Sequence, residues 1–407
     1  MEDARAPQVQ AGADRTPVVT ARCADYQFAD VQAAVRQVLA PLGGMAAFVR
    51  PGERIALKPN LLLGAAPEQA ITTHPAVVAA VAIEVREAGA YPLVVESPGS
   101  GIVHVQSMIE RIYRKTGLRE AAERYGFELS LDMGWQAVSL PEARLVRRLE
   151  VMDPILAVDG VISLAKFKTH TFMVFTGATK NLFGVIPGLN KVGFHGKFVD
   201  PLRFADMLLD VAGFVRPRLS IVDGILGMEG KGPGTAGTPR SLGFLLAGTD
   251  TVAMDVVCCR IAMIDAAAVP VLVAARERGL WSGRAADIDA VGVPVTELLV
   301  KDFALPASHA RERGDSPVGL VERLARPVLR GLFTTRPRPK KGRCTVCGSC
   351  EQACPGKAIT LDTQGRVAKV DDALCIRCYC CHEVCPSAAI DLEYTGLGRA
   401  VHRLGQV

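Results

Sequence analysis

The sequence predicts an α/β domain with a mostly parallel sheet and flanking helices, followed by a small α+β domain at the C-terminus. From about residue 17 to residue 300, short apolar runs alternate with helical stretches. The runs are apolar on both faces, as strands buried in a parallel sheet require, and the alternation is typical of α/β domains. Nine of the twelve cysteines then fall between residues 344 and 385, which marks a second, separate unit.

Each predicted strand is a run of four to six Val, Ile, Leu or Ala residues that ends in polar residues. The strands are predicted within RIALKPN (54–60), PLVVESPGSG (92–101), GVISLAKFKTH (160–170), LSIVDGILG (219–227) and FLLAGTD (244–250). Helices are predicted between several of them, within 75–90, 105–126 and 251–264. Pro75 stands at the first position of the first helix and Gly89 near its end, which are the positions that proline and glycine prefer.

The bulk composition limits location and partners. The formal net charge is +5 in 407 residues and aromatic residues make up 5%, so nothing indicates nucleic-acid binding. No apolar run reaches the roughly 18–20 residues that a membrane helix needs, and the N-terminus has no secretory pattern. We therefore expect a cytoplasmic protein with no nucleic-acid partner and no membrane partner.

Three segments are expected outside the two folded units, which span 17–300 and 344–395. Residues 1–16 are predicted to be disordered, and 396–407 to form a tail. Residues 301–343 are predicted to hold an amphipathic helix over 318–333 and then a basic, proline-rich linker over 334–343. Such a linker is extended and semi-rigid. It is expected to be solvated, with binding to an acidic partner as the alternative.

An internal repeat dominates the C-terminal unit. CTVCGSCEQACPGKAIT (344–360) aligns with CIRCYCCHEVCPSAAID (375–391) at a constant offset of 31 residues, and 359–371 predicts a hairpin that turns near Gly365. Each half spells C-x2-C-x2-C-x3-C-P, the run that bacterial two-cluster ferredoxins use. The fourth cysteine of each run reaches the other cluster. The unit is therefore predicted to be a ferredoxin-like domain that holds two [4Fe–4S] clusters.

The spacing assigns four thiolates to each cluster. The first cluster is predicted to be held by Cys344, Cys347, Cys350 and Cys385. The second is predicted to be held by Cys375, Cys378, Cys381 and Cys354. Structural zinc is the alternative, but zinc sites normally use two separated pairs, and the third cysteine of each run would be surplus.

The remaining cysteines need a separate interpretation. Cys380 is the spare one within the second run. It is either a small residue packed beside the cluster, or a reserve ligand or redox-active thiol. Cys23, Cys258 and Cys259 stand alone, and the last two are predicted to be core residues of an apolar helix. His382 lies inside the motif and is interpreted as a polar neighbour that tunes the cluster.

Polar side chains stand where the five predicted strands end, and ligands of α/β domains usually bind outside the carboxyl ends of strands. These residues are Lys58 and Asn60, Glu96 and Ser97, Lys166 with Lys168 and His170, Asp223, and Asp250. If the ends share one edge of the sheet, they form a charged cleft that suits a small anionic or polar molecule. Ordinary strand-end polarity is the alternative.

Two further segments add candidate binding residues. TTHP (72–75) places Thr73 or His74 at a helix N-terminus, a natural seat for an anion, although simple helix capping is the alternative. The glycine-containing segment 176–197 carries Lys180, Asn181, Lys191, His195 and Lys197. It is predicted to clamp a carboxylate or phosphate, or to close over a ligand, with a solvated basic surface as the alternative.

Several of these motifs together resemble a known family. ALKPNLL, TTHP, VVESPG, KFKTHTFMVFTGATKNLFG and IVDGILGMEGKGP, followed by CIRCYCCHEVCP, are similar to the family described as domain of unknown function 362 with a fused ferredoxin module. The resemblance covers about residues 17–395. It implies a soluble iron–sulfur protein of prokaryotic type that acts in electron transfer or as an oxidoreductase.

The leading hypothesis is an iron–sulfur oxidoreductase that passes electrons through two clusters to a small polar or anionic substrate. The candidate substrate-binding residues are Lys58, Asn60, Thr73, His74, Lys166, Lys168, Lys180 and Asn181. His170, Glu96 and Asp223 are the candidate proton donors, because reduction at carbon or nitrogen usually needs a positioned acid. The alternative is a non-enzymatic electron carrier or adaptor that docks a partner enzyme. Either function predicts a low-potential electron donor or acceptor protein as a partner.

Overall fold

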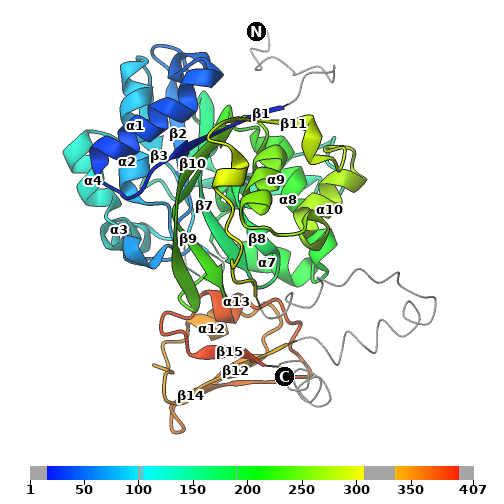
Figure 1. The fold of residues 1–407 in the computed structure, drawn as a ribbon. Helices are drawn as coiled ribbons and strands as arrows, with labels where there is room; N and C mark the ends of the chain where they lie inside the picture. Colours follow the sequence, from blue (N-terminus) through cyan, green and yellow to red (C-terminus); the bar gives the residue numbers. More distant parts are fainter. Residues whose placement is uncertain (1–15, 100–101, 103, 189, 307–334, 394–407) are drawn as a thin grey trace.

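The computed structural model describes residues 16–99, 102, 104–188, 190–306 and 335–393, and it contains one large sheet with helices on both faces (Figure 1). Eight strands follow one another in the order β11-β1-β10-β9-β7-β2-β3-β4, and β8 pairs with β7 beside this path. The strands are β1 (Thr16–Arg22), β2 (Arg54–Pro59), β3 (Tyr91–Val94), β4 (Glu128–Leu129), β7 (Gly160–His170), β8 (Val174–Thr176), β9 (Leu219–Gly230), β10 (Gly237–Gly248) and β11 (Ile288–Gly292).

Two hydrophobic cores lie on the two faces of this sheet, because its central strands are apolar on both sides. One core is covered by α1 (Phe28–Leu39), α2 (Pro75–Glu87), α3 (Gln106–Lys115) and α4 (Leu118–Tyr125). The other is covered by α8 (Pro201–Val215), α9 (Thr251–Ile261) and α10 (Pro270–Glu277). The shorter elements are β5 (Trp135–Ser139), β6 (Arg148–Met152), α5 (Asp153–Leu156), α6 (Ala178–Asn181) and α7 (Asn190–Lys197).

The predicted fold class is confirmed, with changes in individual elements. The predicted helix over 105–126 is two helices, α3 and α4, because Gly117 between them has a left-handed φ of 74°. The strand predicted within 92–101 ends early, at Val94. The strand predicted within 244–250 begins at Gly237 and runs antiparallel to both of its neighbours, β9 and β1. This reversal decides which strand ends meet at one edge.

The C-terminal unit is built from two short helices and two strand pairs. Its elements are β12 (Arg336–Pro339), α12 (Ser349–Gln352), β13 (Ile359–Asp362), β14 (Val367–Val370), α13 (Cys380–Glu383) and β15 (Ile390–Glu393). The hairpin predicted over 359–371 is confirmed as β13 and β14. In Figure 1, α13 is the part of this unit that lies next to the ends of the large sheet.

The basic segment predicted to be a solvated linker is instead a strand of the C-terminal unit. β12 pairs antiparallel with β15. Arg336 and Arg338 both contact Asp372, at 3.0 and 2.7 Å, so the positive charges of the segment are compensated inside the unit. Residues 1–15, the helix predicted over 318–333 and the tail predicted over 396–407 lie outside the described residues.

Candidate functional site where the two units meet

Four of the five predicted strand ends lie at one edge of the large sheet. β2, β3, β7 and β9 are mutually parallel, so their carboxyl ends meet there. The fifth end, Asp250, follows the antiparallel β10 and therefore belongs to the opposite edge. Asp250 instead caps α9 by accepting hydrogen bonds from the backbone N–H groups of Val252 and Ala253. We refer to the first edge as the carboxyl edge.

The first group at the carboxyl edge is a buried ion pair between Lys58 and Glu96. Lys58 Nζ lies 2.6 Å from Glu96 Oε2, and the two side chains are 0% and 3% exposed. Burial lowers the pKa of Lys58, while the carboxylate of Glu96 opposes this shift. The backbone of Gly184 passes so closely that an added Cβ would lie 2.1 Å from Glu96 Oε1. The pair is thus enclosed by protein on all described sides.

The second group centres on Asp223. Its carboxylate receives hydrogen bonds from the Tyr26 hydroxyl at 2.8 Å, from Lys166 Nζ at 2.8 Å and from the backbone N–H of His74 at 3.0 Å. Burial lowers the pKa of Lys166 against the attraction of Asp223. The carboxylate raises the pKa of Tyr26 further than burial alone. This set of partners favours a role for Asp223 in the framework of the edge.

His74 and Thr73 are also engaged by the protein itself. His74 is the N-cap of α2, where its Nδ1 accepts a hydrogen bond from Ala76 N–H, and its ring stacks on Tyr26 at 3.6 Å. Burial lowers the pKa of His74 to about 4. Thr73 Oγ1 donates to the carbonyl of Leu164 and accepts from the N–H of Asn60. The helix cap is therefore His74, and Thr73 ties β7 to the loop after β2.

Two asparagines link the lysines of the carboxyl edge. Asn181 Oδ1 accepts from Asn60 Nδ2 at 3.3 Å and from Lys58 Nζ at 3.5 Å. Asn60 Oδ1 accepts from Lys168 Nζ at 2.6 Å, and the carbonyl of Ile71 accepts a second bond from Lys168. Burial lowers the pKa of Lys168 well below its usual value, and the nearby Lys180 lowers it further.

The segment 176–197, predicted to clamp an anion or to close over a ligand, is largely helical and inward-facing. Lys191 is buried and donates to the carbonyls of Ser97 and Pro98, at 2.6 Å each. His195 packs 4.5 Å from the ring of Phe204, and burial lowers its pKa to about 3. Lys197 is exposed. The segment is therefore neither a solvated basic surface throughout nor a free loop, and it closes one side of the edge.

Helix α13 of the C-terminal unit covers the carboxyl edge. Glu383, at the end of α13, is 3% exposed and places Oε1 3.4 Å from His170 Nε2 at the end of β7. The backbone N–H of Phe172 donates to His170 Nδ1, so a neutral His170 carries its proton on Nε2, toward Glu383. Burial raises the pKa of Glu383 to about 7, and Lys180 and Lys168 act in the opposite direction.

Three backbone contacts hold α13 and the residues just after it against the segment 231–236, which connects β9 to β10. Thr235 Oγ1 donates to the carbonyl of Cys385 at 2.6 Å. His382 Nε2 lies 3.2 Å from the carbonyl of Lys231. The other ring nitrogen, Nδ1, lies 2.6 Å from the carbonyl of Ile390 within the C-terminal unit and so fixes the ring. An added Cβ on Gly234 would lie 2.4 Å from the carbonyl oxygen of Glu383. His382 thus connects the two units, and its expected role in tuning the cluster stays a prediction.

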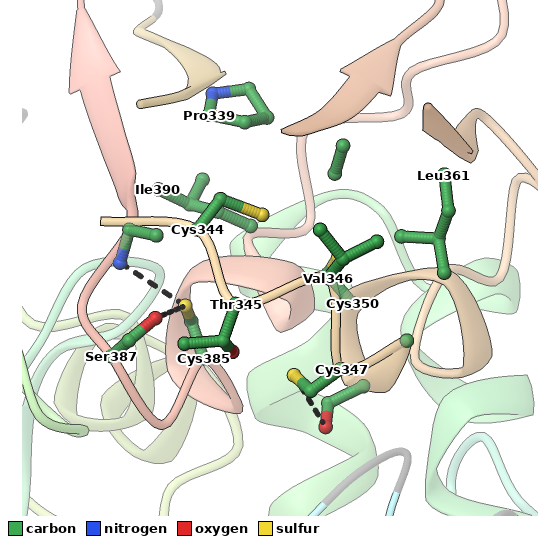
Figure 2. Close-up of a pocket in the computed structure, with 14 residues that line it drawn as sticks. Pro339, Cys344, Thr345, Val346, Cys347, Cys350, Leu361, Cys385, Ser387 and Ile390 are labelled. Atoms are coloured by element: carbon green, nitrogen blue, oxygen red, sulfur yellow. Dashed lines mark hydrogen bonds between the residues drawn. The ribbon is translucent and has the colours of Figure 1, made fainter. Parts of the chain in front are cut away.

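The eight motif cysteines line two pockets in the C-terminal unit. The first pocket, of about 330 Å³ including space open to solvent, is lined by Cys344, Cys347, Cys350 and Cys385 (Figure 2). The second, of about 300 Å³ on the same measure, is lined by Cys354, Cys375, Cys378 and Cys381. Among the described residues, no group of three or more His, Cys, Asp or Glu side chains is arranged to hold a single metal ion.

The two pockets have the same local construction, as the sequence repeat predicts. The fourth sulfur of each run accepts a backbone N–H at 3.1 Å, from Ala358 to Cys354 and from Ala389 to Cys385. Left-handed residues recur at the same offset of 31, namely Val346 with Arg377, Gly348 with Tyr379, and Lys357 with Ala388. Four thiols per pocket with amide donors to sulfur are the surroundings that a [4Fe–4S] cluster requires.

Cys380 does not line either pocket. It is fully buried and packs with Ala353, Cys378 and Val384, and hydrogen bonding to its thiol lowers the pKa of Cys378. The corresponding residue of the first repeat is Ser349, whose Oγ lies 3.5 Å from Cys347 Sγ. Cys380 therefore stands where the first repeat has a hydroxyl beside a motif cysteine, which favours its interpretation as a packed neighbour of the cluster.

Glu383 is the residue at this site that sequence reasoning missed. In the repeat, Glu383 corresponds to the exposed Gln352. The two short helices, SCEQ and CCHE, share only the ligand cysteine, so the sequence alone does not show which half docks. Tyr26 and Gly184 were also missed, since nothing in their local sequence connects them to the carboxyl edge.

These features define an iron–sulfur domain docked on the strand ends of an α/β domain. The chain belongs to the family described as Domain of unknown function (DUF362), whose model matches residues 55–260, and residues 343–389 match a 4Fe-4S dicluster domain. A relative, the thylakoid-associated protein sll1697 of Synechocystis, is 36% identical over 299 residues, which cover 70% of this chain and 86% of the relative. No helix in the described ranges has the length and apolar character to cross a membrane.

Two solved structures are remotely similar to this chain. The lactate racemase apoprotein from Thermoanaerobacterium thermosaccharolyticum is 12% identical, with a TM-score of 0.39 over 60% of this chain and 56% of that one. A protein from Thermotoga maritima is 12% identical, with a TM-score of 0.29 over 50% of this chain and 51% of that one. The chain thus spans about half the length of each of these two structures.

Proposed function

We propose that this protein is an iron–sulfur oxidoreductase that delivers electrons to a small polar or anionic substrate at the carboxyl edge. The position of α13 carries this proposal. The helix joins Cys381, at the second pocket, to Glu383, which is buried beside His170. A cluster in the second pocket would therefore lie within a few residues of the charged side chains at the strand ends.

The cysteines that line each pocket are proposed as the cluster ligands. Cys344, Cys347, Cys350 and Cys385 would hold the first cluster, and Cys354, Cys375, Cys378 and Cys381 the second. When bound, such clusters supply or accept single electrons. Cys347 is exposed whereas Cys378 and Cys381 are buried. We therefore assign the exchange of electrons with a low-potential partner protein to the first pocket.

The residues of the carboxyl edge divide into two roles. Lys58, Asn60, Thr73, His74, Lys166 and Asn181 are engaged by other protein groups and would shape the site. Glu96 and Asp223 are similarly held by lysines. Lys168 donates to Asn60 and to the carbonyl of Ile71 but keeps one of its three donors, so Lys168 and Lys180 remain the groups for contact with a substrate. His170, with Nε2 directed toward Glu383, is the proposed proton donor.

A non-enzymatic electron carrier is the second candidate, because the exposure of Cys347 also suits exchange between two proteins at the first pocket. A carrier would use the contact at α13 only to fix the orientation of the two units. A cytoplasmic location remains a prediction in both cases.

The test is to reduce the anaerobically purified protein and follow its visible absorbance after addition of cell extract. The extract is divided into a small-molecule fraction and a protein fraction. Lys180→Ala is the test variant. Lys301→Ala, at an exposed position, is the matched control. Lys58→Ala is less suitable than Lys180→Ala, because it would leave the buried carboxylate of Glu96 without its partner.

Rapid reoxidation of the wild type and the Lys301 variant by the small-molecule fraction, with slow reoxidation of the Lys180 variant, would support the oxidoreductase. Reoxidation by the protein fraction alone, at equal rates in all three proteins, would instead identify a carrier.

A further inference from the structure

Hydroxyl groups stand beside two sulfurs of the first pocket. Ser349 Oγ lies 3.5 Å from Cys347 Sγ, and Ser387 Oγ lies 3.7 Å from Cys385 Sγ. Figure 2 shows Ser387 directed at Cys385. A cysteine sulfur that binds iron has lost its proton, so it can only accept a hydrogen bond. In the loaded protein both hydroxyls are therefore the donors.

The second pocket differs at both matching positions. The offset of 31 residues places Gly356 at the position of Ser387, and glycine has no side-chain donor. The same offset places Cys380 at the position of Ser349, and a thiol is a weaker donor than a hydroxyl. The sulfurs of the second pocket thus receive less hydrogen bonding from side chains than those of the first.

Other influences on the two pockets are matched or mixed. The fourth sulfur of each run accepts one backbone N–H at 3.1 Å. Cys347 is exposed where the matching Cys378 is buried, but Cys385 is buried where the matching Cys354 is half-buried. Arg377 lines the second pocket, but it is partly exposed, so water and salt screen its charge. The hydroxyls are therefore the difference that separates the two pockets.

Hydrogen bonds to the sulfurs raise the reduction potential of a cluster, because they stabilise the extra negative charge of its reduced form. We propose that Ser349 and Ser387 hold the first cluster at a higher reduction potential than the second. One electron from a low-potential donor protein then rests in the first pocket, with the donor oxidised by one electron and the first cluster reduced by one. The inference rests on the proposed function only in its assignment of the clusters to the pockets.

The order of potentials gives the two clusters different tasks. The first cluster collects the electron at the pocket where Cys347 is exposed. The second cluster is the stronger reductant, and α13 joins its ligand Cys381 to Glu383 at the carboxyl edge. The stronger reductant thus stands on the side where we propose that the substrate binds.

The hydrogen bonds set the size of the difference. One hydrogen bond changes an equilibrium constant about fivefold. Ser387 faces a glycine at the matching position, and Ser349 faces a weaker donor. An electron should therefore favour the first pocket by about five- to 25-fold, which corresponds to about 40–80 mV at 59 mV per factor of ten.

The test is a stepwise electrochemical reduction of the anaerobic holoprotein, with electron paramagnetic resonance and visible absorbance recorded at each potential. The wild type should show two one-electron waves with this separation. Ser387→Ala should shift the upper wave downward by about fivefold, or about 40 mV, and leave the lower wave in place. Ser387→Thr keeps the hydroxyl and should leave both waves unchanged. Thr363→Ala is the matched control, because it removes an exposed hydroxyl that lines neither pocket.

A reciprocal variant tests the other pocket. Cys380→Ser places a hydroxyl at the position that Ser349 has in the first repeat, and it should raise the lower wave by up to about fivefold. The upper wave should stay in place. The integrated resonance signals show that both clusters are bound in each variant. If Ser387→Ala loses a cluster, the wave that Cys380→Ser moves decides the question.

Coinciding waves in the wild type would overturn the proposal. So would a Ser387→Ala variant that shifts the lower wave or neither wave, or a Cys380→Ser variant that raises the upper wave. These outcomes are separate from those of the reoxidation test, because the measurement needs no substrate. Ordered waves without reoxidation by small molecules would sustain this proposal and reject the oxidoreductase, whereas coinciding waves with such reoxidation would do the reverse.

Discussion

Replacing Gly234 with alanine tests whether α13 is seated on the α/β domain as described. The new Cβ would lie 2.4 Å from the carbonyl oxygen of Glu383 and 3.2 Å from its carbonyl carbon. A real Cβ needs at least 3.0 Å, so the two backbones must separate by at least 3.0 − 2.4 = 0.6 Å. The obstacle is backbone, which cannot rotate away as a side-chain end can.

The contacts of α13 set the size of the effect. The Thr235–Cys385 bond at 2.6 Å and the His382–Lys231 contact at 3.2 Å would both be stretched. Each hydrogen bond contributes about 1 kcal/mol, and an unpaired buried partner adds about 1–3 kcal/mol. We therefore expect the docked state to lose about 2–4 kcal/mol. Local opening of α13 would then become roughly 30- to 900-fold more frequent.

Hydrogen exchange of the amides of residues 380–385 measures this opening, and urea unfolding measures global stability. Gly213→Ala is the control, because no atom lies within 4 Å of its added Cβ and the residue is inside α8. That substitution should stabilise the protein by about 0.5–1 kcal/mol. If exchange at 380–385 is the same in Gly234→Ala as in the wild type, α13 is not packed against Gly234 and the account of the docking is wrong.

Three further predictions concern buried groups. His195 has a pKa of about 3 when folded and about 6.5 when unfolded, so the unfolded chain binds the extra proton. The contribution of His195 to stability is therefore full above about pH 6.5 and falls by about 1.4 kcal/mol per pH unit toward pH 3. Because the folded-state pKa of His74 is lowered too, to about 4, His195→Phe should reduce the loss of stability between pH 8 and pH 5 in urea unfolding by about 2 kcal/mol without abolishing it, and an unchanged loss would contradict the assignment. If the Cys380 thiol donates a hydrogen bond of about 1 kcal/mol to Cys378, Cys380→Ala should lower the potential of the second cluster by about 40 mV. A redox titration in which the potentials of both clusters shift equally would contradict this prediction. Lys166→Met should destabilise the protein by about 3–5 kcal/mol because Asp223 is left buried and unpaired, and adding Asp223→Asn should recover part of this loss in thermal unfolding.

The local features of this protein follow from its sequence. The spacing of the cysteines predicted both pockets, because three sulfurs of each pocket come from one tight loop of consecutive residues and the repeat supplies the fourth from the other run. The apolar runs determined the strands of the α/β domain, since burial on both faces leaves a continuous apolar pattern. Helix α2 was predictable to within a few residues from Pro75 and Gly89.

The tertiary structure decided the features that depend on distant partners. The direction of β10 follows from its pairing with β9 and β1, and this direction removed Asp250 from the carboxyl edge. The basic segment became β12 because β15, more than fifty residues later, offered it a strand to pair with. The position of Glu383 was likewise decided by tertiary structure, because the corresponding residue of the first repeat, Gln352, is exposed. Its burial beside His170 arises from the docking of two separately folded units, and such contacts leave no periodic pattern along the chain.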